Sequence, residues 1–198
     1  MAFWHELVTE KSFQLLTEFR KKYRFVLIGG WAVFLYTRQL KSKDIDLVLS
    51  HEELMRFRED WNVEKNSRLK KYEIKTGEFD VDLYVPFYSN PGLPPEAILK
   101  TQVSREGFSV PSIEELLLMK LNAYQARRDS LKGEKDRLDI ASLVATGEID
   151  WKRWRKLISS YARSDLQTLF RQFLTETREV RELSLSAHRW AGIKRGIL

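Results

Sequence analysis

Residues 24–49 read RFVLIGGWAVFLYTRQLKSKDIDLVL, and we expect the rest of the fold to be organised around them. An apolar run ends at Gly29-Gly30, and a second apolar run opens with Asp44 and Asp46. Alternate residues of a strand share a face and lie about 6–7 Å apart, so the two aspartates stand side by side. Adjacent carboxylates repel each other unless a cation lies between them, and hard oxygen ligands suit Mg²⁺ or Mn²⁺. The sequence therefore predicts a metal site at the start of this strand.

The glycine pair and the basic turn before the aspartates predict a phosphate site. Gly29 and Gly30 let backbone N–H groups approach a ligand, and a helix that starts there attracts anions. Ser42 and Lys43, in the turn just before Asp44, could add contacts to phosphate oxygens. The simpler alternatives are a tight turn at the glycines and a solvated basic turn at 41–43.

A second acidic strand is expected over 77–85, GEFDVDLYV. Its odd-numbered apolar residues make one face, and Asp80 and Asp82 share the other face with Tyr84. Either aspartate could join the first pair as a third carboxylate, and the alternation alone does not choose between them.

Further along the chain, Lys120 is followed after fifteen residues by Asp136-Arg137-Leu138-Asp139. The two aspartates are three residues apart, so they lie on one face of the expected helix. One interpretation is a buried ion pair between helices. The other is that Lys120 contacts a triphosphate oxygen while Asp136 and Asp139 position it or contact the nucleotide sugar.

This ordered set resembles the nucleotidyltransferase superfamily, the DNA polymerase β-like group, over about residues 20–145. The signature of that superfamily is an apolar strand, Gly-Gly or Gly-Ser, a spacer and Asp-x-Asp; thirteen residues separate Gly30 from Asp44 here. Gly30 replaces the serine of many relatives, so a hydroxyl that could hold phosphate is lost. The late lysine and Asp-x-x-Asp are similar to a motif of the AbiEii-type branch.

The resemblance implies that Asp44, Asp46 and a third carboxylate hold two divalent cations. Asp82 is the favoured third ligand, because Val-Asp-Leu followed by apolar residues most resembles the third strand of the family. Asp80 is then a neighbouring metal or substrate contact. One cation would activate the acceptor hydroxyl, and the other would bridge the triphosphate.

The implied function is metal-dependent transfer of a nucleoside monophosphate from an NTP to an acceptor hydroxyl, with release of pyrophosphate. The acceptor could be an RNA or tRNA end or a protein side chain, and the chain could belong to a toxin–antitoxin pair with a cognate toxin or antitoxin partner. Two alternatives stay open. One is a nucleotide-binding, RNA-binding or antitoxin-like module without turnover, and the other is a nucleotidyltransferase for small, aminoglycoside-like molecules.

The composition indicates the cellular compartment and the kind of partner to expect. The 198 residues are 43% hydrophobic and 31% charged, with no cysteine, no long apolar run and no apolar core of signal-peptide type at the start. We expect a cytoplasmic protein that makes no membrane contact. Residues 1–150 hold 23 Lys and Arg against 24 Asp and Glu, whereas residues 151–198 hold 11 against 4. The basic end suits a polyanionic partner, with RNA as the leading candidate, and the alternative is a solvated helical surface that binds nothing.

The motif WKRWRK (151–156) has two interpretations. Its tryptophans and cations suit single-stranded nucleic acid. At helical spacing, however, Trp151 and Trp154 share a face with Ile158, a pattern typical of a helix that packs on a core.

The sequence predicts an α/β fold, a nucleotidyltransferase-like mixed sheet flanked by helices with a C-terminal helical bundle. The catalytic domain is expected over 1–110, and a helical domain that closes the cleft over 111–198. Ser50 should cap a helix, with Glu53 three residues on. The expected elements are a helix over 2–22, strands over 24–28 and 44–49, helices over 30–38 and 51–60, strands within 61–85, a helix near 95–100, an edge strand over 101–110, and helices over 112–129, 133–146, 150–162 and 164–183.

Overall fold

The computed structural model describes residues 6–197, and its contacts divide the chain into two compact units, Ala2–Ser112 and Ile113–Leu198. The first unit is mixed α/β and the second is helical, which confirms the predicted fold class. The first residues of the helix expected over 2–22, including Phe3, lie outside the described residues.

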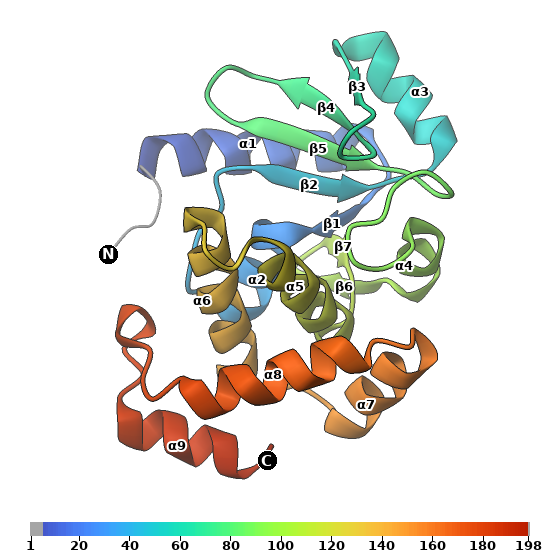
Figure 1. Ribbon diagram of the computed structural model, residues 1–198. Coiled ribbons are helices and arrows are strands. Elements are labelled where there is room, and N and C mark those ends of the chain that lie inside the picture. Colours follow the sequence, from blue (N-terminus) through green and yellow to red (C-terminus); the bar gives the residue numbers. More distant parts are fainter. Residues whose placement is uncertain (1–5, 198) are drawn as a thin grey trace. The chain divides into compact units, whose positions relative to one another are not determined.

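Figure 1 shows the elements of the first unit in chain order. They are α1 (Glu6–Lys22), β1 (Val26–Ile28), α2 (Gly29–Thr37), β2 (Ile45–Val48), α3 (His51–Asp60), β3 (Glu64–Asn66), β4 (Lys71–Lys75), β5 (Asp80–Tyr84), α4 (Pro95–Thr101), β6 (Val103–Arg105) and β7 (Phe108–Val110).

Five strands form one sheet in the order β1-β2-β5-β4-β3. The β2 and β5 strands run parallel, and the other neighbours are antiparallel. Because side chains alternate along each strand, one face of the three central strands is apolar and buried. It carries Ile45, Leu47, Ile74, Val81 and Leu83. The other face carries the acidic residues singled out in the sequence.

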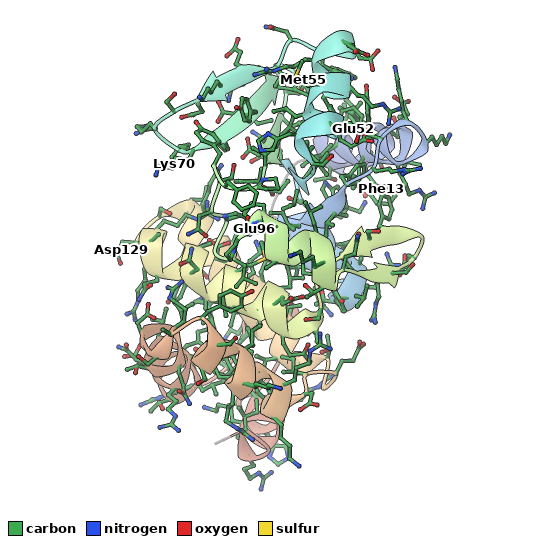
Figure 2. All side chains as sticks on the ribbon, turned by 90° about the vertical axis from the view of Figure 1, so that its right-hand side faces the viewer. Phe13, Glu52, Met55, Lys70, Glu96 and Asp129 are labelled. Atoms are coloured by element: carbon green, nitrogen blue, oxygen red, sulfur yellow. The ribbon has the colours of Figure 1, made fainter. Side chains whose placement is uncertain are left out.

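Local sequence signals explain several element boundaries. The Ser50 hydroxyl accepts the Glu53 backbone N–H at 3.1 Å, so the predicted cap of α3 is confirmed. The Glu53 carboxylate does not return to Ser50; it accepts the backbone N–H of Arg24 at 3.1 Å instead. The turn between β3 and β4 places Lys70 in the left-handed region at φ 48°, and Figure 2 shows its side chain pointing away from the protein.

The edge strand expected over 101–110 is wrong. The segment forms a hairpin, β6 and β7, in a two-stranded sheet of its own. The two turn residues, Glu106 and Gly107, both have positive φ, at 51° and 78°. A two-residue turn of this kind reverses the chain tightly and matches the twist of the paired strands, so the segment pairs with itself.

The second unit contains only helical elements and one isolated β-bridge in its described part. These are α5 (Ile113–Arg127), α6 (Leu131–Ala145), α7 (Trp151–Ser160), α8 (Ser164–Glu176), the 3₁₀ turn η1 (Arg181–Leu183) and α9 (Ala187–Arg195).

Two helix predictions in this unit need correction. The helix expected over 164–183 ends at Glu176, and α9 was not anticipated. Val180 and Leu185 pair as a β-bridge around η1, and Ser184 takes φ 56°. That bridge reverses the chain, and Ser186 then caps α9 by accepting the Arg189 backbone N–H. None of the helices within residues 6–197 has the length and apolar character that crossing a bilayer requires.

Candidate active site

Gly29 lies against the carboxylate of Asp46. It is the first residue of α2 and takes φ 66°, a conformation that favours glycine. A Cβ atom at this position would lie 2.1 Å from Asp46 Oδ2, so only glycine leaves room for the carboxylate. The Asp46 side chain therefore sits at the start of α2, where the unpaired N–H groups of a helix attract negative charge.

Asp46 and Asp82 lie directly opposite each other on the parallel strands β2 and β5. Neighbouring strands are about 4.8 Å apart, so the two carboxylates share one face at close range. Asp80 lies two residues before Asp82 on β5. Its side chain is 43% exposed and pairs with Lys75 at 3.1 Å. Its backbone N–H donates to Asp44 Oδ1 at 3.2 Å. The register thus places Asp82, and not Asp80, across from Asp46.

The environment of Asp82 disfavours its charge. Burial, followed by the negative charge of Asp46, raises the pKa of the Asp82 carboxyl from 3.8 to about 7, although Lys71 opposes the shift. The Oδ1 atom is buried and has no hydrogen-bond partner among the described residues. A buried oxygen without a partner is costly and is uncommon in folded proteins.

A lysine and a glutamate on β4 complete the acidic face, and the sequence reasoning missed both. Lys71 Nζ lies 2.5 Å from Asp82 Oδ2 and 2.8 Å from Glu73 Oε1. Glu73 is the cross-strand partner of Asp82. The alternation in KYEIK could have placed Lys71, Glu73 and Lys75 on one face, but it could not say which face of which sheet.

The side chains of this face decide whether it suits a divalent cation. Within residues 6–197, no three His, Cys, Asp or Glu side chains are grouped as they are around a metal ion. Asp46 and Asp82 nevertheless offer hard oxygens from neighbouring strands, and Asp82 Oδ1 has no hydrogen-bond partner there. A cation bound at Oδ1 would satisfy that atom and offset the repulsion from Asp46. The pair therefore fits an oxygen-ligated cation such as Mg²⁺, with Asp44 two residues away on the same chain.

The turn before Asp44 is more enclosed than a solvated basic turn. Ser42 is buried, and its hydroxyl donates to the Asp44 carbonyl oxygen at 3.1 Å. Lys43 is half-buried. The Ser42 hydroxyl therefore holds the turn that presents Asp44, and contact of Ser42 or Lys43 with phosphate stays a prediction.

Lys120, Asp136 and Asp139 come together inside the helical unit. Lys120 Nζ lies 3.2 Å from Asp136 Oδ1 and 2.7 Å from Asp139 Oδ2, and both aspartates are almost fully buried. Lys135 joins Asp139 at 3.1 Å, and Arg127 joins Asp136 at 2.7 Å. Burial raises the pKa of the Asp136 carboxyl, but the neighbouring cations outweigh it and the net shift is downward. Lys120 thus forms buried ion pairs with Asp136 and Asp139, as the first interpretation expected. Nucleotide binding by the three residues stays a prediction.

The two tryptophans of WKRWRK pack against Phe170 in the helical unit, and Trp154 is buried there. Trp154 is 3% exposed, and its ring lies 5.1 Å from that of Phe170. Trp151 stacks on the same Phe170 at 5.7 Å. The basic residues 152, 153, 155 and 156 are exposed. The core interpretation therefore holds for Trp154, and RNA contact by the cations stays a prediction.

Comparisons with known proteins add a structural similarity. No protein-family model matches the chain, and no curated protein matches it in sequence. Among solved structures, the chain is similar to an antigenic nucleotidyltransferase-like protein from Paracoccidioides brasiliensis. The two are 18% identical, with a TM-score of 0.42, and the match covers 81% of this chain and 90% of the other.

Proposed function

We propose that the chain is a metal-dependent nucleotidyltransferase that moves a nucleoside monophosphate from an NTP to an acceptor hydroxyl. The observation that carries the proposal is the placement of Asp46 opposite Asp82, with Gly29 and the start of α2 against Asp46. Strand, glycine turn, helix and paired acidic strands also follow the order in which the sequence resembles the superfamily.

Asp44, Asp46 and Asp82 are the residues that would hold Mg²⁺ or Mn²⁺. Bound there, the metal would supply charge neutralisation for the triphosphate and lower the pKa of the acceptor hydroxyl. The chain itself contributes orientation, because Asp46 and Asp82 lie on two hydrogen-bonded strands that fix their spacing, and Asp44 lies just before the first of them. Asp82 Oδ1, which is buried and has no hydrogen-bond partner among residues 6–197, is the atom suited to bind the metal.

The acceptor we favour is an RNA or tRNA end, supported by the exposed cations of α7 at 152, 153, 155 and 156. A cationic surface attracts a phosphate backbone without regard to its sequence. A protein side chain as acceptor, and membership of a toxin–antitoxin pair, stand on the resemblance to the AbiEii-type branch alone.

The test is transfer of label from each of the four α-labelled NTPs to RNA, protein or small hydroxyl acceptors with Mg²⁺ or Mn²⁺. Asp46→Asn and Asp82→Asn should each reduce transfer by about 100-fold or more, the scale of losing a catalytic acid or base. Asp80→Asn is the matched control, because it removes a carboxylate from the same strand face at an exposed position. Equal labelling by wild type and Asp46→Asn, or none by wild type with any acceptor, would refute the proposal.

A second function is favoured by one specific observation. Lys71 pairs with Asp82, and no three-carboxylate cluster is formed in the described part of the chain. These features suit a module that binds Mg-NTP or RNA without turning it over. Calorimetric binding of Mg-NTP together with a complete absence of labelled product would favour this second function.

A further inference from the structure

Lys71 reaches from β4 into the acidic face and holds two carboxylates at once. Its ammonium group lies 2.5 Å from Asp82 Oδ2 and 2.8 Å from Glu73 Oε1. The three side chains are 12%, 13% and 10% exposed, so water screens their charges only weakly. A lysine ammonium is a compact charge on a flexible stem, and it can move between neighbouring acceptors.

Glu73 is the better anchored of the two acceptors. Asn66 Nδ2 donates to Glu73 Oε1 at 3.1 Å, and Lys75 Nζ lies 3.4 Å from Glu73 Oε2. These contacts fix Glu73 without Lys71. The ammonium of Lys71 could therefore leave Asp82 and remain paired with a carboxylate that is already in place.

The two oxygens of Asp82 have different surroundings. The β5 strand lies between β2 and β4, so Asp46 flanks Asp82 on one side and Glu73 on the other. Oδ2 is engaged by Lys71, whereas Oδ1 has no hydrogen-bond partner in the described chain. A metal ion shared by Asp46 and Asp82 would lie within a few ångströms of the ammonium, and two cations on one carboxylate repel each other.

We propose that Lys71 is an internal cation that competes with a divalent metal ion for Asp82, and that Glu73 retains Lys71 when the metal binds. This inference rests on the proposed function, because it takes the same carboxylates as metal ligands. It assigns Lys71 and Glu73 a positioning role: they keep the acidic face neutralised without metal and set how tightly the metal is held.

The test measures Mn²⁺ binding to the full chain without nucleotide, from the electron paramagnetic resonance signal of free Mn²⁺. Lys71→Met should lower the dissociation constant by about 10-fold or more, because it removes a charge in direct contact with a ligand. Lys75→Met is the matched control: it contacts Glu73 on the same strand face but not Asp82, and its side chain is 49% exposed. It should change the constant by less than about threefold, as expected for a screened charge.

Glu73→Gln tests the same idea in the opposite direction. Without the Glu73 charge, Lys71 depends on Asp82 alone, so Mn²⁺ should bind more weakly than to wild type. Lys71→Gln is a second variant that keeps hydrogen-bond donors, in case Lys71→Met does not fold, and it should also tighten binding.

Three results would overturn the inference. The wild type and the Lys71 variants could bind Mn²⁺ with equal affinity, or Lys75→Met could raise the Mn²⁺ affinity as much as Lys71→Met does. The third is that none of these proteins binds Mn²⁺. Its failure is distinguishable from that of the proposed function, because the Mn²⁺ measurement requires no NTP and no acceptor. Tighter binding by Lys71→Met with no labelled product would uphold the competition and refute transfer. Labelled product together with equal Mn²⁺ affinities of wild type and Lys71→Met would uphold transfer and refute the competition.

Discussion

The ionisation of Asp82 predicts that the α/β unit loses stability as the pH rises. Burial and the charge of Asp46 raise the pKa of Asp82 from 3.8 to about 7. The folded state therefore holds this proton more tightly than the unfolded state. The contribution is fully present below about pH 4 and is lost as the pH rises to about 7, and the gap between the two pKa values corresponds to about 4 kcal/mol.

The perturbation that isolates this effect is Asp82→Asn, which keeps the size of the side chain and removes its titration. Near pH 4, where Asp82 is protonated, wild type and variant should have similar free energies of unfolding. By pH 8 the variant should be more stable than wild type by about 4 kcal/mol, provided that a chelator keeps metal away. Asp80→Asn removes a carboxylate from the same face and should keep the wild-type fall in stability.

The assay is urea unfolding between pH 4 and pH 8, followed by two-dimensional NMR signals of β5 so that only the α/β unit is observed. The carboxyl carbon of Asp82 should also titrate near pH 7 in a ¹³C spectrum. A titration midpoint below about pH 5, together with a wild-type-to-variant difference that does not change with pH, would refute the reasoning from burial and the Asp46 charge.

Three further predictions concern packing and helix ends. Gly29→Ala should destabilise the α/β unit by more than Gly77→Ala, because both have positive φ but only Gly29 would place a Cβ 2.1 Å from a carboxylate oxygen; equal losses in chemical denaturation would contradict this. Lys120→Met should cost about 3–5 kcal/mol in thermal unfolding, since it leaves Asp139 with one fewer cation in a buried site, and a cost below about 1 kcal/mol would show that the ion pair is dispensable. Ser50→Ala should cost about 1 kcal/mol through loss of the α3 cap, and no change in the unfolding midpoint would argue against that cap.

Residue alternation predicted the faces of the acidic strands but not which residues meet. By alternation alone, Asp80 and Asp82 were equivalent, because both obey the period of two; only the family resemblance favoured Asp82. The parallel pairing of β2 with β5 separates them by setting Asp82, and not Asp80, opposite Asp46. A shift of two residues in that pairing would keep every side chain on its face and exchange the two roles.

Helical spacing likewise predicted which side chains share a helix face but not what that face contacts. It placed Trp151 and Trp154 on one stripe, but burial against Phe170 decided that Trp154 lies in the core. The same holds for Lys120, whose two interpretations used the same spacing. The contacts with Asp136 and Asp139 became visible only once α5 and α6 were packed together.

Local features followed from the amino-acid sequence alone: the glycine turn into α2, the cap at Ser50, and the face of each strand on which the aspartates lie. These follow from backbone preferences and short periods, which neighbouring residues set. The pairing of Lys71 with Asp82 and the contact of Gly29 with Asp46 could be recognised only in the folded sheet. Such contacts join residues far apart in the chain, and they depend on strand order and register, which the packing of the whole sheet fixes.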